Sequence, residues 1–159
     1  MKIQLILIML LLGVVLTVHL AMNGQVGAAL KNARVGNAIF WCIGAATALV
    51  IGFSGWRPGA LEPLKQINPL LLTAGVMGGC LVFGIAWVFP RFGAANGTIC
   101  LLAGQMVSGL IISHFGWLGS PQQPVTLLKL GAVVLLFVGV GMMVYEPQAA
   151  IQPPVKDAL

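Results

Sequence analysis

The sequence predicts an all-α membrane protein, a bundle of five transmembrane helices. Hydrophobic residues make up 59% of the 159 residues and charged residues only 7%, against about 25% charged residues in an average soluble domain. The mean hydropathy is +1.03. Five apolar stretches are continuous rather than alternating, which excludes a β-barrel. Because so few charges cannot coat a soluble domain, we also exclude a cytosolic enzyme, a nucleic-acid binder and a disordered regulator.

Each of the five apolar segments is long enough to cross a bilayer core of about 30 Å, which needs roughly 20 helical residues. Glycine, proline and charged residues separate them. Residues 1–145 are thus expected to form one transmembrane domain and residues 146–159 a flexible polar tail. We do not expect the first segment to be cleaved as a signal peptide, because it is long and His19 stands two positions before Ala21. The helices are expected at about 3–23, 38–55, 69–89, 94–117 and 125–145.

The basic residues are shared equally between the two sides of the predicted bundle. Five helices place the chain termini on opposite sides, and a cytoplasmic excess of Lys and Arg normally sets the orientation. Without an excess, either the chain inserts in both orientations, or a partner, the first helix or the translation context selects one. Two inverted copies would reproduce the inverted repeat that many transporters carry in one chain. One side holds Lys2, Arg57, Lys65 and Lys129, and the other holds Lys31, Arg34, Arg91 and Lys156.

Small residues recur four positions apart along the predicted helices. Residues at this spacing share one helix face and let two backbones approach closely. We therefore expect tight helix packing, which is typical of a polytopic bundle and does not separate a channel, a transporter and an assembly subunit. The residues are Gly44, Ala48 and Gly52, then Gly75 and Gly79, then Gly104 and Ser108, with Gly131, Gly139 and Gly141 in the last helix.

Acidic residues are missing from all five predicted helices. Glu62 lies in a connection, and Glu146 and Asp157 lie in the tail. A proton-coupled exporter of cations usually keeps a buried carboxylate that holds the cation and the proton in turn. This chain on its own therefore lacks that chemistry.

Five residues are candidates for a substrate-binding cavity. His19 and Asn23 are four positions apart and share one helix face, and Gln105 lies near the middle of its helix. An amide in lipid needs a partner, so Gln105 either joins two helices or lines a cavity. His19 either contacts substrate or protons, or is a neutral hydrogen-bonding residue. Phe83 and Trp87 either wall an apolar or cation-stacking pocket or face lipid or the core.

The sequence contains neither a cluster of metal ligands nor a pair of nucleophile and base. We therefore expect no cofactor, no metal and no enzymatic activity.

Several short motifs are spread along the chain. Val35–Ala38 follows Asn23 and leads into an aromatic-rich helix, and Gly75 precedes Gly78 and Gly79. Further motifs are Pro90–Ala95, Ala103–Gln105 and Ser113–Gly119. Together these motifs, over about residues 5–145, resemble the small YdcZ-like branch of the drug/metabolite transporter superfamily.

This resemblance implies a five-helix protein of the bacterial inner membrane, equivalent to one half of the ten-helix EamA-like transporters. It also implies pairing with a second copy or with a sibling chain. Carried over by position, Asn23 and Gln105 are the polar intramembrane residues of the family. Members often have an aspartate where this chain has Ser113. Any coupling or assembly role of that carboxylate is therefore absent here or supplied by a partner.

We predict a transporter protomer that moves a small metabolite or drug-like solute across the bacterial inner membrane by alternating access. Its expected partners are the lipid bilayer, the solute, and a second or sibling protomer that lies antiparallel to it. We expect no nucleic-acid partner. The alternatives are a non-transporting accessory or assembly subunit of a membrane complex and a pore.

Overall fold

The computed structural model describes residues 2–145, and every regular element in this range is helical. Five helical spans are long and apolar enough to cross a membrane, which confirms the predicted fold class. The expected polar tail, residues 146–159, lies outside the described residues. The spans are α1 (Lys2–Ala29), α2 (Ala33–Ser54), α3 with α4 (Pro69–Leu72 and Ala74–Phe92), α5 (Ala94–Phe115) and α6 (Leu127–Tyr145).

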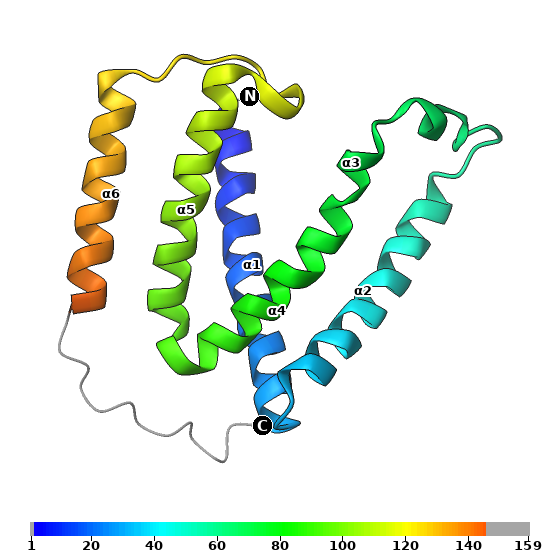
Figure 1. The fold of residues 1–159 in the computed structure, drawn as a ribbon, viewed down its shortest axis with the longest axis horizontal. Helices are drawn as coiled ribbons and strands as arrows, with labels where there is room; N and C mark the ends of the chain where they lie inside the picture. Colours follow the sequence, from blue (N-terminus) through cyan, green and yellow to red (C-terminus); the bar gives the residue numbers. More distant parts are fainter. Residues whose placement is uncertain (1, 146–159) are drawn as a thin grey trace. The chain divides into compact units, whose positions relative to one another are not determined.

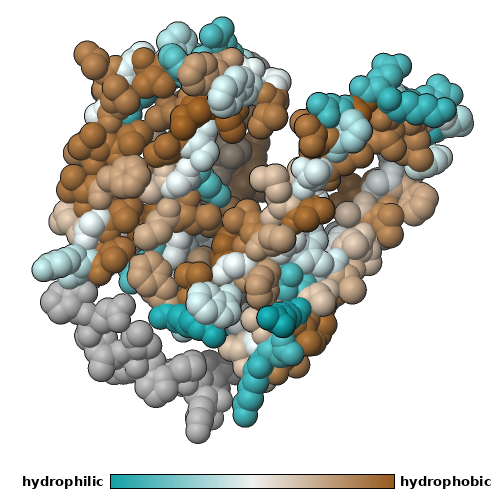
Figure 2. Space-filling view, viewed as in Figure 1, coloured by the Kyte–Doolittle hydropathy of each residue, from teal (hydrophilic) through white to brown (hydrophobic). Residues whose placement is uncertain are grey.

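The chain divides into two compact units, Met1–Gly97 and Thr98–Leu159. The first unit contains α1, α2, α3 and α4 and the first turn of α5, and the second contains the rest of α5 and α6. Figure 2 shows hydrophobic side chains along the lengths of the helices and hydrophilic ones gathered mainly at helix ends and connections. This distribution is what helices surrounded by lipid require.

In the first unit, α1, α2 and α4 pack against one another. The helices α1 and α2 meet at their shared turn and diverge away from it, while α4 lies beside α2 (Figure 1). The contacts are therefore concentrated near the turn, and most of the N-terminal half of α1 is exposed.

The first helix extends beyond Asn23 as far as Ala29. It continues because Gly24 and Gly27 are buried on its packed face, where glycine favours close helix contact rather than a turn. Asn23 is therefore placed well inside the membrane-spanning helix.

The third span is two helices separated at Thr73. Pro69 lies in the first turn of α3, and the side chain of Asn68 accepts a hydrogen bond from the backbone N–H of Leu70. The span ends at Gly93, whose φ of +84° is a conformation that glycine adopts without strain.

The closest approach of the first unit joins the backbones of α1 and α2. A Cβ atom added to Gly36 would lie 2.7 Å from the Cα of Gly27 and 2.9 Å from its backbone nitrogen. Such distances leave no room for a side chain at Gly36, so the two helices meet there backbone to backbone. The contacts with α4 are looser, because a Cβ on Gly24 would lie 3.5 Å from the carbonyl oxygen of Ala86.

The glycines that make these contacts are not those of the stripes identified in the sequence. A Cβ added to the stripe glycines would meet no atom of the described residues within 4 Å. Within each of the two units, the expectation that these stripes bring helices together is therefore wrong. Four-residue spacing indicates a shared face, but it does not indicate what that face contacts. The open positions are Gly44, Gly52, Gly75, Gly79, Gly104, Gly131, Gly139 and Gly141.

In the second unit, the connection between α5 and α6 folds back onto the end of α5. The backbone N–H of Gln123 donates to the carbonyl oxygen of Ser113 (2.7 Å), and that of Val125 donates to Nδ1 of His114 (3.2 Å). Gly116 ends α5 with a left-handed φ of +67°, a common way to terminate a helix. The Ser113–Gly119 motif thus has a local structural role in ending this helix.

Gly36→Ala should lower the free energy of unfolding by about 1–3 kcal/mol, because the new methyl group pushes α1 and α2 apart. Gly13→Ala, where the space is open, should raise it by about 0.5–1 kcal/mol because alanine favours helix. Denaturant titration of both purified variants in the same detergent measures the difference. Equal effects would show that the Gly27–Gly36 contact does not hold the helices together.

Candidate functional site

A groove of about 240 Å³ lies between α1 and α2 in the first unit. Each helix lines the groove with four residues, at positions i, i+3, i+4 and i+7. This spacing places four side chains on one helix face, so the groove is formed by two facing stripes. The lining residues are His19, Met22, Asn23 and Val26 from α1 and Gly36, Ile39, Phe40 and Ile43 from α2.

The imidazole of His19 presents an aromatic face and a hydrogen-bond acceptor. Its Nδ1 lies 2.9 Å from the carbonyl oxygen of Leu16. Because a carbonyl oxygen only accepts, Nδ1 carries the hydrogen, and in the neutral ring Nε2 is then an acceptor. The ring also stacks on Phe40, with centroids 5.4 Å apart and planes inclined by 26°.

The amide of Asn23 is buried and has no partner within residues 2–145. The side chain is 3% exposed, and neither Oδ1 nor Nδ2 has a hydrogen-bond partner among the described residues. Asn23 contributes to the wall of the groove, but its amide atoms lie beneath the groove surface. An unpaired buried polar group costs about 1–3 kcal/mol, and lipid supplies no water to replace the missing partner.

The other aromatic candidates lie on α4, outside this groove. Phe83 is half-buried, and Trp87 is 49% exposed. The guanidinium of Arg91 lies 4.2 Å from the ring centroid of Trp87 and donates to the Trp87 carbonyl oxygen. The ring of Trp87 is therefore already in contact with a cation of its own helix, the guanidinium of Arg91, which lies one turn further along α4.

Gln105 is exposed on α5, in the second unit. Near it on the same helix, Gly104 has no side chain, and the Ser108 hydroxyl donates to the Gly104 carbonyl oxygen (2.9 Å). The structure therefore brings His19 and Asn23 together and places Gln105, Phe83 and Trp87 elsewhere along the chain.

Sequence reasoning missed the contribution of α2 to the groove. Phe40 stacks on His19, and Gly36 lets α2 approach α1 closely enough to form the floor. A third residue, Asn37, has an Oδ1 atom that is buried without a partner in the described chain. The available signal was the Val35–Ala38 motif, which carries both a glycine and an amide but was not assigned to a site.

Asn23→Leu should raise the free energy of unfolding by about 1 kcal/mol, because leucine fills a similar volume and removes the unpaired amide. Gln25→Leu, an exposed change on the same helix, should alter stability by less than about 0.5 kcal/mol. Unfolding of each variant in mixed micelles measures both values. A clear loss of stability in Asn23→Leu would show that the amide holds the fold together.

The family described as "Putative inner membrane exporter, YdcZ" matches residues 4–142, which include most of every span. Comparison with curated proteins and comparison with solved structures each gave no match. The family match confirms the resemblance seen in the motifs. With five helices able to cross a membrane, it describes a multi-pass protein of the inner membrane. The chain belongs to the YdcZ family of inner membrane proteins, whose description is that of an exporter.

Proposed function

We propose that the chain is one protomer of a transporter that moves a small solute across the inner membrane by alternating access. The family description points to export. The observation that carries the proposal is the buried, unpaired amide of Asn23 beside the groove of His19 and Phe40. Unpaired polar groups persist where function requires them, and a solute that passes through the protein can supply the missing partner.

An accessory subunit explains this amide less well. A subunit that only stabilises a complex gains nothing from an unsatisfied polar group inside its own helix bundle. An apolar side chain of similar volume at Asn23 would pack against the same neighbours at lower cost. The amide therefore favours a solute-handling role over a purely structural one.

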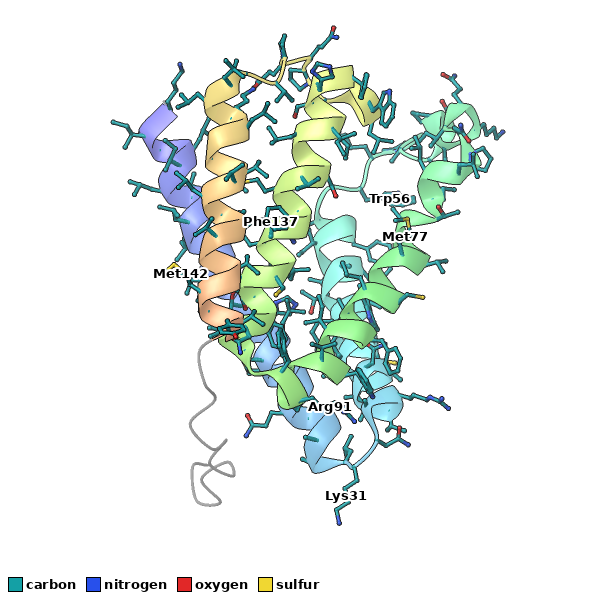
Figure 3. All side chains as sticks on the ribbon, turned by 60° about the vertical axis from the view of Figure 1, so that its left-hand side comes forward. Lys31, Trp56, Met77, Arg91, Phe137 and Met142 are labelled. Carbon is teal, nitrogen blue, oxygen red and sulfur yellow. The ribbon has the colours of Figure 1, made fainter. Side chains whose placement is uncertain are left out.

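We further propose that two protomers lie antiparallel and together provide the ten helices of an inverted-repeat carrier. The first unit carries Lys31 and Arg91 near the same end, and Trp56 lies toward its other end (Figure 3). Lys31 and Arg91 are thus on the same side, as in the sequence-based count of basic residues, in which the two sides balance and neither orientation is favoured. The second protomer is another copy of this chain or a sibling.

Exposed features give the second protomer surfaces to cover. The amide of Gln105 is exposed, although in hydrocarbon it needs a partner. The open glycine faces of α2 and α6 permit close helix contact with another chain. In the assembled carrier, Gln105, Phe83 and Trp87 complete the cavity lining that begins with His19 and Asn23.

Both ends of the protein should be found on both sides of the membrane. A cysteine placed in a tag at the C-terminus of the full chain, in a background without Cys42, Cys80 and Cys100, should be labelled only in part by an impermeant maleimide in intact cells. Complete labelling should follow permeabilisation. Labelling that is complete or absent in intact cells, when only this chain is expressed, would contradict dual insertion.

The purified protein should move solute when it is reconstituted. Vesicles loaded with a bacterial metabolite extract should lose at least one solute faster than protein-free vesicles, as measured by mass spectrometry of the external buffer. Gln105→Ala should slow that efflux at least about tenfold if its amide lines the pathway, while Gln25→Ala should not.

Two outcomes of this experiment would count against the proposal. Solute retention equal to that of protein-free vesicles would favour the accessory-subunit alternative. Efflux accompanied by ionic current in a planar bilayer would indicate a pore instead of a carrier.

A further inference from the structure

The groove between α1 and α2 contains enough chemistry to define the class of solute it takes. This inference rests on the proposed function and goes beyond it. We propose that the groove binds an uncharged aromatic solute that carries an N–H or O–H donor next to a carbonyl acceptor. A primary aromatic amide is the simplest molecule of this class.

The absence of charge around the groove indicates an uncharged solute. Within residues 2–145, Glu62 is the only acidic residue, and it lies in the short 3₁₀ helix Glu62–Gln66, outside the spans. The groove itself is lined without lysine or arginine. A cationic or anionic solute would therefore lie in low-dielectric surroundings without a counter-charge, which is expensive inside a membrane.

The size and the surfaces of the groove indicate a flat aromatic body. Its volume of about 240 Å³ is small and suits a single-ring solute. The stacked rings of His19 and Phe40 present aromatic surface along one side, and Met22 adds a flexible thioether that adapts to ring edges. Aliphatic side chains form most of the remaining wall.

Hydrogen bonding adds the requirement for a paired donor and acceptor. The hydrogen on Nδ1 of His19 is directed to Leu16, so Nε2 of the neutral ring accepts from a donor on the solute. The amide of Asn23 offers one acceptor and one donor group, both unused within the described chain. A change of the Asn23 rotamer turns this amide into the groove, where the carbonyl and N–H of the solute satisfy it.

Four probes of nearly identical shape separate these requirements. Benzamide has the donor, the acceptor and no charge, and acetophenone replaces the donor NH₂ with CH₃. Benzamidinium and benzoate carry one positive and one negative charge. The full-length protein in phosphatidylcholine nanodiscs should bind labelled benzamide saturably in equilibrium dialysis, above the level of protein-free nanodiscs. Each of the other three probes should compete at least about tenfold more weakly.

Matched variants assign the binding to the groove. His19→Phe keeps a stacking ring and loses the acceptor, and Asn23→Leu keeps the volume and loses the amide. Each should weaken benzamide binding at least about tenfold, while Gln25→Leu, exposed on α1, should leave it unchanged. If either variant does not fold, the order of the four probes on the unaltered protein decides the question.

Three results would overturn the inference. Benzamidinium or benzoate binding as tightly as benzamide would show that the site takes charged solutes. Acetophenone binding equally well would show that hydrogen bonding does not select the solute. Absence of saturable benzamide binding would remove the solute class altogether. None of these results bears on whether reconstituted vesicles release another solute. The transporter proposal is therefore tested separately, by the efflux measurement.

Discussion

The contact of Gly27 with Gly36 is the constraint on which the first unit depends. Two backbones approach here without intervening side chains, and such proximity gains dispersion energy that lipid does not supply equally well. The contact determines which residues of α1 and α2 face each other further along the helices. From this crossing point, identical spacing on the two helices brings His19 opposite Phe40 and forms the groove.

In lipid, a polar side chain without a partner in its own chain indicates that another molecule supplies the partner. A soluble protein can satisfy a buried amide with an ordered water, but a helix in hydrocarbon has only protein or a bound molecule to supply the partner. Asn23 is buried without a partner among the described residues, whereas Gln105 is exposed. These are two different forms of incompleteness. In the carrier that we propose, a solute supplies the partner of Asn23, and a second protomer covers Gln105.

Ser113, where the motif resemblance implies an aspartate in other members, lies at the end of α5. The Ser113 hydroxyl lies 3.5 Å from that of Ser120, and the Ser113 carbonyl oxygen accepts from Gln123. These bonds involve the residues that close the connection to α6. Serine thus serves the local structure of the connection without adding a charge, which is consistent with the proposed binding of an uncharged solute.

Sequence alone determined the fold class, because about twenty consecutive apolar residues make a spanning helix whatever surrounds them. The same argument predicted the five spans, and the motifs predicted the family. Sequence also placed His19 and Asn23 on one face, since their spacing matches the helical repeat. These properties are local, so neighbouring residues along the chain decide them.

Only the tertiary structure decided what each face contacts. Helical spacing singled out Gly44 and left Gly36 outside the expected second helix, yet Gly36 meets the backbone of α1, and Gly44 meets open space among the described residues. From the sequence, Trp87 was a candidate wall of a binding pocket. The structure shows that the guanidinium of Arg91 lies against its ring. The membership of Phe40 in the groove and the isolation of the Asn23 amide depend on where two helices cross. That crossing is set by the backbone contact of Gly27 with Gly36 across the turn between α1 and α2, which a periodic pattern within one helix does not encode.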